Sequence, residues 1–417
     1  MIKSISNDND AYAALKIKDF RLFIMARFAL TFAIQMQSVI IGWQVYSITK
    51  DPLSLGLIGL AEAIPFLSIA LYAGHVADTV NRKKIILISV SVYFLGAIGL
   101  LLLSSDLSFL LQIFGIFPIY AVIFCTGLAR GFFFPAQSAL MAQLVPRKLY
   151  ANSSTWNSTF YEIAAVSGPA IGGLIYGFAG IYYAYLTVIV FVALSLLCFS
   201  RMASKPLPVT NKNETLMQNL AAGFKFVFSH QIVLAALSLD MFAVLFGGAV
   251  SLLPVFAMDI LKTGPQGLGI LRAAPAIGSV LMAFFLAYHP PLRKAGHNLL
   301  VAVCGFGVCI ILFALSRNFI LSFLLLALSG MFDDVSVIIR GTIIQLFTPD
   351  EMRGRVASVN SIFIGSSNEI GSFESGLAAK LLRVVPSVIF GGTMTLIVVA
   401  STYKLAPKLR RLNLLNK

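Results

Sequence analysis

The chain has 417 residues, of which 58% are hydrophobic and only 12% are charged, and its mean hydropathy is +0.89. This composition excludes a soluble globular domain, because too few charged side chains are present to hydrate its surface. The net charge of +14 does not indicate a nucleic-acid partner, because the basic residues are distributed as membrane topology requires.

Uncharged stretches long enough to cross a lipid bilayer recur along the chain, and about 20 helical residues suffice for each crossing. The hydrophobic blocks and the residues that interrupt them predict twelve transmembrane helices, so the expected fold class is an all-α membrane protein. The expected helices are 20–48, 53–78, 84–105, 108–140, 150–177 and 180–200 in the first half, and 229–258, 267–290, 297–316, 319–346, 352–380 and 384–404 in the second.

The longest polar interruption, residues 201–228, lies near the midpoint of the chain. We interpret it as a cytoplasmic linker whose second part is a helix lying on the membrane surface. It separates a first six-helix bundle, residues 1–200, from a second, residues 229–417. These three segments are the predicted domains.

An internal repeat relates the two halves. A constant shift along the sequence superposes Pro146 on Pro349 and Asn157 on Asn360. The fourth and fifth predicted helices therefore recur as the tenth and eleventh, which indicates two six-helix bundles related by a pseudo-twofold axis along the membrane normal.

Basic clusters lie in the even-numbered connections between helices, among them Arg82-Lys83-Lys84 and Arg147-Lys148. Lys and Arg are retained on the cytoplasmic side of a membrane, so both termini are expected in the cytoplasm. The first 19 residues are polar and contain three aspartates, unlike a cleavable signal peptide. We expect a multi-pass protein of the inner (plasma) membrane.

Ionisable side chains within the predicted helices are few, and each is expected to face a cavity or a partner because a charge in lipid is costly. Glu62 and Asp240 lie near the middle of the second and seventh helices. A medium of low dielectric disfavours their charged forms, so protonation can be exchanged against substrate binding or a conformational change. Proton coupling and a static ion pair with a membrane arginine are equally good interpretations of both, and a polar position at the rim of the cavity is a third.

Other charges are expected to line a central cavity between the halves: Arg27, Arg130, Asp333, Asp334, Arg340 and Glu369. The two arginines of the fourth and tenth helices, Arg130 and Arg340, are counter-ions or hooks for anionic groups. Asp333 and Asp334 point about 100° apart on a helix, so both cannot face one pocket, and one is expected to meet Arg340 two turns later. Arg272 is a further ionisable residue, without a predicted role.

Three uncharged side chains are candidates for the lining of the cavity. Gln35 and Gln37 in the first helix and Phe132 in the fourth would give it a polar and aromatic wall suited to bulky amphipathic solutes. Ordinary helix packing is the alternative for the aromatic residue.

The connection after the second helix contains Gly74, Asp78 four residues later, and then Arg82 in a basic cluster. It resembles the signature of the major facilitator superfamily between helices two and three. The resemblance implies that these residues stabilise one of the alternating conformations of a transporter. Asn81 stands where the family usually has glycine.

The fifth helix contains Gly168, Pro169, Gly172 and Gly173. This sequence is similar to the pattern on helix five of the exporters of the superfamily, and it implies an exporter. Glycine and proline at this place allow close packing and bending of a helix between the halves.

Residues 330–340, 348–356 and 368–371 resemble the branch of the superfamily that contains enterobactin-type siderophore exporters and macrolide efflux proteins, and the resemblance extends over nearly the whole chain. It implies a secondary active transporter, a proton-coupled exporter of amphipathic small molecules by alternating access. We expect a monomer in the lipid bilayer. A lysophospholipid or nutrient transporter is the nearest alternative, and a receptor without transport is an alternative of a different class.

Motifs of enzymes are missing from the sequence. It contains neither a His-Glu-x-x-His motif, nor a Gly-x-Ser-x-Gly motif, nor a Gly-Lys-Ser/Thr phosphate loop, and its four histidines are dispersed. We therefore expect no enzyme, no metal site and no cofactor, and an ion gradient, with protons as the coupling ion, as the source of energy.

Overall fold

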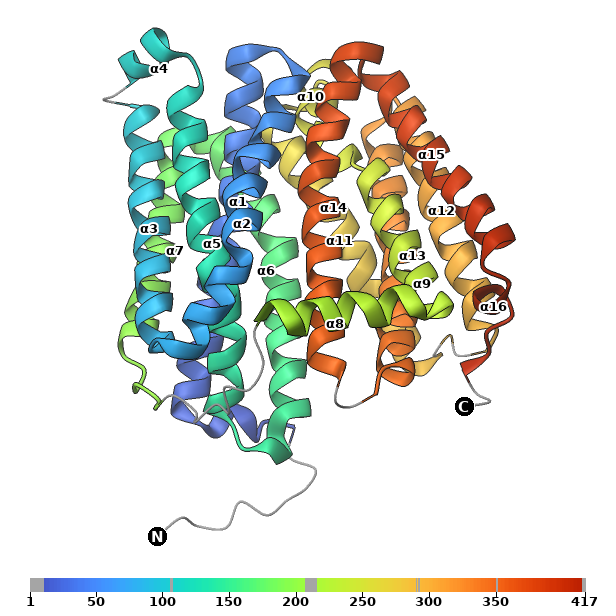
Figure 1. The fold of residues 1–417 in the computed structure, drawn as a ribbon. Helices are drawn as coiled ribbons and strands as arrows, with labels where there is room; N and C mark the ends of the chain where they lie inside the picture. The colour runs from blue at the N-terminus through green and yellow to red at the C-terminus, as the bar shows by residue number, and fades with distance from the viewer. Residues whose placement is uncertain are drawn as a thin grey trace.

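The computed structural model of the protein describes residues 11–105, 108–206, 216–289, 291, 293–349 and 352–414. Within these residues the chain is helical and contains no strand. Two bundles stand side by side (Figure 1), the first built from α1 to α7 and the second from α9 to α16.

The first bundle consists of six long helices, α1 (Lys18–Thr49), α2 (Pro52–Thr79), α3 (Arg82–Leu103), α5 (Phe117–Leu144), α6 (Tyr150–Ala179) and α7 (Ile181–Ser200), with the short elements η1 (Ala14–Lys16), α4 (Ser108–Phe114) and η2 (Arg147–Leu149). The predicted fourth helix, 108–140, was wrong in joining α4 to α5. The chain turns between them at Gly115, whose φ of +60° is a left-handed conformation that glycine adopts without strain.

The second bundle contains α9 (Gln231–Phe246), α11 (Gly264–Tyr288), α12 (Ala295–Leu315), α13 (Phe319–Phe347), α14 (Arg353–Leu382), α15 (Val384–Leu405) and the short α16 (Pro407–Arg410). The predicted seventh helix, 229–258, is not continuous. After α9 the chain passes Gly247 and Gly248 and continues through η3 (Ala249–Leu252), α10 (Leu253–Val255) and the π-helical turn η4 (Phe256–Ile260). Pro254 lacks a backbone donor, which favours this break.

Eleven of the described helical segments are long and apolar enough to cross a membrane. The long helix that does not meet this criterion is α14, which has 30 residues and packs beside α2. Its sequence is rich in Ser, Gly and Asn and includes Glu369 and Glu374, because it faces other helices and a central cavity as well as lipid. With α14 included, the prediction of twelve helices is confirmed.

The described part of the chain begins and ends at the same end of the molecule, which we call the terminal end; α4 and α10 lie at the opposite, far end (Figure 1). Helix α8 (Leu216–Ser229) runs across the second bundle, nearer the terminal end (Figure 1). It contacts the start of α14, where the ring centroids of Phe224 and Phe363 are 6.4 Å apart. Its place at a membrane surface and the domain limits stay predictions, and residues 207–215 of the linker lie outside the described residues.

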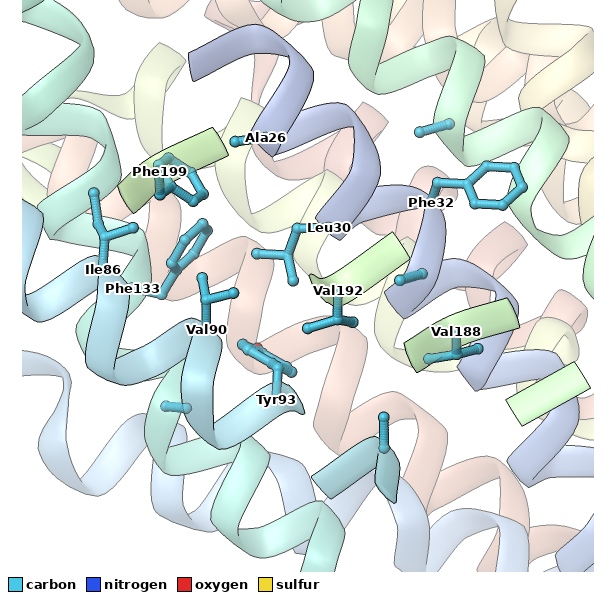
Figure 2. Close-up of a cluster of buried hydrophobic side chains, with 14 of the residues drawn as sticks. Ala26, Leu30, Phe32, Ile86, Val90, Tyr93, Phe133, Val188, Val192 and Phe199 are labelled. Carbon is cyan, nitrogen blue, oxygen red and sulfur yellow. The ribbon is translucent and has the colours of Figure 1, made fainter. Parts of the chain in front are cut away.

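Each bundle has its own apolar core. In the first bundle, side chains from α1, α3 and α7 meet, as Figure 2 shows for Leu30, Val90 and Phe199. At the far end, a core cluster of the second bundle extends to Val39 of α1 and Leu55 of α2. Apolar packing therefore joins the two halves at that end.

Small residues let the halves approach closely at the far end. A Cβ atom added to Gly376 of α14 would lie 2.7 Å from the Cα of Gly56 of α2, and one added to Gly173 of α6 would lie 2.7 Å from the Cα of Gly269 of α11. Such distances leave no room for a side chain, so these four glycines define two crossing points between the halves.

The predicted helix-five motif lies on α6 and packs against two partners. A Cβ atom at Gly168 would lie 2.9 Å from the Cβ of Gln35, and one at Gly172 would lie 3.0 Å from the Cγ of Met36, both on α1. Gly173 faces α11 instead, and Pro169 lies within the helix. The motif thus provides close packing, while its link to the direction of transport stays a prediction.

We predict that Gly173→Ala destabilises the protein by ~1–3 kcal/mol, the range found when methyl groups are forced into a packed core. Gly341→Ala is the matched control, because a Cβ atom at Gly341 of α13 meets nothing within 4 Å. Thermal unfolding of the purified proteins in detergent measures both effects. An equal melting temperature for the two variants would contradict the close crossing at Gly173.

Candidate functional site

A cavity of about 600 Å³ lies between the two bundles, a size that suits a drug-sized solute. Its walls come from α1, α2, α3, α5 and α6 of the first half and from α9, η3, α10, α11, α12, α13 and α14 of the second. The polar lining residues are Arg27, Thr31, Gln35, Ser38, Glu62, Arg130, Gln137, Ser251, Arg272, Ser329, Asp333, Asn368, Glu369 and Ser372, and the aromatic ones are Tyr93, Phe133, Phe134, Tyr161 and Phe306.

Arg130 of α5 connects carboxylates from both halves of the molecule. Its Nη1 atom lies 2.6 Å from Oε1 of Glu62 on α2 and 2.7 Å from Oε1 of Glu369 on α14. Its guanidinium also lies 5.1 Å from the centroid of the Phe66 ring. We call Glu62, Arg130 and Glu369 the bridging cluster. Because two carboxylates share one cation, the ionised cluster carries one net negative charge.

Close helix packing places the bridging cluster. A Cβ atom at Gly127 of α5 would lie 2.7 Å from the backbone oxygen of Glu62, and one at Gly59 of α2 would lie 3.1 Å from the backbone oxygen of Glu369. Glycine at both positions brings α2 against α5 on one side and against α14 on the other. The three charged side chains meet where these helices cross.

Arg27 of α1 makes polar contacts with neutral partners. It donates a hydrogen bond to Oδ1 of Asn157 on α6. With the amide oxygen of Gln137 on α5 turned toward it, its Nη1 and Nε atoms donate over 3.0 and 3.1 Å. The guanidinium lies 5.8 Å from the ring centroid of Tyr161.

Arg272 of α11 also contacts neutral groups. Its Nη2 atom donates to the hydroxyl of Ser38 on α1 over 3.0 Å, which is a contact between the halves, and its Nη1 atom donates to the carbonyl of Val250 over 3.2 Å. The cavity thus has cationic groups on both of its walls, besides the cation of the bridging cluster.

Asp240 and Arg340 form an ion pair within the second bundle, on α9 and α13. Both are buried, and neither lines the central cavity. A void of about 10 Å³ beside Asp240 adjoins Asp333 and Ser336. The expectation that Asp333 or Asp334 meets Arg340 was wrong, because α9 brings Asp240 to the arginine across the bundle.

The cavity lining differs from prediction at four positions. Asp333 lines the cavity but Asp334 does not; the latter lies near Ser279 of α11 and Glu162 of α6, as expected for neighbours about 100° apart on a helix. Arg340 is turned to Asp240 within the second bundle.

Gln37 and Phe132 were the other two wrong assignments. Gln35 lines the cavity, whereas Gln37, two residues further along α1, does not. Phe132 packs edge-on against Tyr72, with centroids 6.2 Å apart, while Phe133 and Phe134 reach the cavity. The phase of a helix could not be fixed from the residue types alone.

The predicted gating motif lies at the terminal end, where α2 meets α3. Arg82 is buried and its Nε atom donates to the carbonyl of Ala77 over 3.1 Å. The neighbouring Lys83 donates to the carbonyl of Ser200, the last residue of α7, over 2.8 Å and to that of Met202 over 2.6 Å. The basic cluster therefore anchors the turn within the first bundle. Gly74 lies on α2, the side chain of Asp78 lies outside the described structure, and the gating role stays a prediction.

Polar contacts between the halves close the far end of the cavity. Tyr46 of α1 donates to Oδ2 of Asp259 in η4. Lys380 of α14 lies 3.0 Å from Oδ2 of Asp51 at the start of α2. Together with the shared apolar core and the two glycine crossings, these contacts hold the halves together above the cavity.

Comparison with known proteins identifies the family. The model of the transmembrane secretion effector family matches residues 9–416. The chain belongs to this family of major facilitator transporters. Its members are transporters, and so this chain is a transporter and not an enzyme.

Relatives and solved structures agree with this assignment. The enterobactin exporter EntS of Shigella dysenteriae is 26% identical over 384 residues, which are 91% of this chain and 89% of that protein. EntS of Escherichia coli O81 is 26% identical over 397 residues, which are 94% of this chain and 92% of that protein. A bacterial homologue of the iron transporter ferroportin, in an inward-facing state, is similar in fold with a TM-score of 0.72, 14% identity, and coverage of 95% and 99%. The D-xylose–proton symporter is similar in fold with a TM-score of 0.71 and 11% identity, and the match covers 94% of this chain and 98% of that one.

Sequence reasoning missed part of the site. Arg272 stood out as an ionisable residue within a predicted helix, but nothing in the sequence indicated that it faces Ser38. Gln137 and Asn157 are neutral, so their residue types did not predict that they contact Arg27. A signal was present for Gln137, because the shift that superposes Asn157 on Asn360 also superposes Gln137 on Arg340.

We predict that Asp240→Asn destabilises the protein by ~3–5 kcal/mol, because it leaves the buried guanidinium of Arg340 without its counter-ion. The double variant Asp240→Leu with Arg340→Met removes both charges and is expected to recover most of that loss. Thermal unfolding in detergent compares the three proteins. If the single variant were as stable as the unchanged protein, the ion pair would not hold this part of the bundle.

Proposed function

We propose that this protein is a proton-coupled exporter of amphipathic small molecules, siderophore-like or drug-like, that works by alternating access. The observation that carries the proposal is the bridging cluster, in which Arg130 contacts Glu62 of its own half and Glu369 of the other half. A charge-based contact between the halves, at the wall of a cavity, is a suitable place to couple protonation to their relative movement.

The coupling follows from the charge of the cluster. Its ionised form has one excess negative charge in a region of low dielectric, so one proton neutralises it. A proton on Glu369 removes its attraction to Arg130 and weakens the bridge between α5 and α14, while a proton on Glu62 leaves the bridge in place. Tyr93 and Arg272 also line the cavity and act on the cluster electrostatically. A proton bound more tightly in one conformation than the other shifts the equilibrium between them.

Asp240 is not assigned to proton coupling. It is buried in an ion pair with Arg340, so we assign it to the stability of the second bundle. Glu62 remains a coupling residue, and Glu369, predicted as a cavity charge, joins it.

The relatives support the exporter direction. Those named are enterobactin exporters that match more than nine-tenths of this chain. The central cavity, with aromatic and polar walls, suits a solute that has both an apolar body and polar groups.

We further propose that the protein is a monomer in the bacterial inner membrane with both termini in the cytoplasm. The connections from α5 to α6 and from α2 to α3 lie at the terminal end (Figure 1); the first contains Arg147 and Lys148 and the second leads directly to Lys83, which supports this orientation by the positive-inside rule. The far end then faces away from the cytoplasm, and its closure supports an inward-facing state. Transport would need an ion gradient and no cofactor.

Purified protein in liposomes with an imposed pH gradient tests the function. Gradient-driven transport of a siderophore, enterobactin, is compared with that of a macrolide, erythromycin, and of a lysophospholipid. Transport of the siderophore or macrolide is the expected result. Movement of the lysophospholipid alone would favour a lipid transporter, and binding of a solute without any flux would favour a receptor.

We predict that Glu62→Gln and Glu369→Gln each lower gradient-driven transport on the order of tenfold, which corresponds to ~1.4 kcal/mol, because each removes a carboxylate that accepts the proton. Counterflow without a gradient is expected to persist. Glu374→Gln is the matched control, because Glu374 is also a glutamate of α14 but does not line the cavity. Unchanged coupling in both cluster variants would refute the proposed coupling site.

We predict that Tyr46→Phe opens the far end more often, because it removes the hydrogen bond to Asp259 without a change of shape. The readout is labelling of Ser251→Cys, a cavity position, by a membrane-impermeant thiol reagent in cells, in a protein whose native cysteines are replaced by alanine. Labelling is expected to rise about two- to fivefold, the factor for a hydrogen bond of ~0.5–1 kcal/mol. Lys404→Met, an exposed position at the end of α15, is the control and should not change the rate.

A further inference from the structure

Arg27 and Arg272 differ from the other arginines within the helices. Arg130 and Arg340 each contact carboxylates. In the described part of the chain, Arg27 has hydrogen bonds to Asn157 and Gln137, and Arg272 has hydrogen bonds to Ser38 and Val250, and neither makes an ion pair. Their positive charges therefore face the central cavity without a bound counter-ion.

An uncompensated guanidinium at this depth needs an explanation. Arginine does not lose its proton in a protein, and a charge within the bilayer region is costly unless a partner or water compensates it. Glu62 and Glu369 are near enough to act on Arg272 electrostatically, but Arg130 already holds both of them. Both Arg27 and Arg272 line the cavity that a solute would fill.

The charges of the cavity wall favour an anionic solute. Its ionisable lining residues are Arg27, Arg130, Arg272, Glu62, Asp333 and Glu369. When the bridging cluster holds a proton it is neutral, and two arginines then oppose the single carboxylate of Asp333. Among the described acidic residues of the cavity wall, only Asp333 makes no ion pair and could attract a cationic solute. Such a solute would also be repelled by both arginines.

The surroundings of Arg27 add an aromatic preference. Its guanidinium lies beside the Tyr161 ring, and Phe134 and Phe133 come from the neighbouring α5. An aromatic solute can pack against these rings while an acidic group on it takes the free donors of the arginine.

We propose that Arg27 and Arg272 form a two-point anion site that binds aromatic solutes with two separated acidic groups. One arginine belongs to each half, so a bound dianion connects α1 and α6 with α11 and fills the space between them. This inference deepens the proposed function, on which it rests for the role of the cavity as the transport site, and it specifies the chemical class of the substrate.

Equilibrium binding in detergent tests the site, because it needs no gradient and no transport. The probes are two dyes with closely similar three-ring bodies: fluorescein, a dianion at mildly alkaline pH, and rhodamine 123, a cation. Fluorescence anisotropy is expected to show fluorescein binding more tightly than rhodamine 123. Added salt should weaken the binding of fluorescein.

Substitutions identify the residues involved. Arg27→Gln and Arg272→Gln should each weaken fluorescein binding on the order of tenfold, and neither should weaken the binding of rhodamine 123. Arg27→Lys and Arg272→Lys keep the charge but lose the planar donor pair, so they should have a smaller effect. Arg317→Gln, an exposed arginine before α13, is the matched control and should bind like the unchanged protein. Melting temperatures confirm that each variant is folded.

Several results would overturn the proposal: tighter binding of the cationic dye, no binding of either dye to folded protein, or fluorescein binding unchanged in both glutamine variants. These outcomes are separate from failure of the coupling. If the glutamate variants of the bridging cluster keep gradient-driven transport while the arginine variants lose fluorescein binding, the anion site stands and proton coupling at the cluster falls.

Discussion

The guanidinium of Arg130 contacts carboxylates from both halves of this transporter at the wall of the central cavity. Arg130 needs a counter-ion there, and it takes Glu62 from its own half and Glu369 from the other. The close approach of α2, α5 and α14, made possible by Gly59 and Gly127, is what allows the three side chains to meet. The cavity, the polar character of α14 and the proposed coupling all depend on this arrangement.

The repeat gives the two halves the same helix plan but not the same chemistry. In the first half, Arg27 on α1 contacts neutral partners on α5 and α6. In the second half, Arg340 stands at the position equivalent to Gln137, and it pairs with Asp240 of α9, the helix equivalent to α1. At these related places the first half thus has an arginine that lines the cavity, whereas the second half has an arginine neutralised within the bundle.

The architecture could be predicted from sequence because crossing a bilayer demands long apolar helices, and because glycine, proline and basic residues mark their ends. The exceptions have local causes, such as the turn at Gly115 and the break at Gly247. The site was less predictable, because residue type shows that a charge needs a partner but not which one. Arg340 was assigned to the wrong aspartate, and Phe132 was chosen where its neighbours face the cavity. Such errors come from helix rotation and from pairing across helices, which a single sequence does not encode visibly.

The order of groups along α5 has a consequence for the path of a solute. This helix runs toward the terminal end, so Gln137 and the bound Arg27 lie nearer that end than Arg130, by two helical turns or roughly 10 Å. A molecule arriving from that side meets a permanent cation before it reaches the bridging cluster. Selection by charge would therefore precede any proton exchange, so that a solute of the wrong sign is turned away without consuming the gradient.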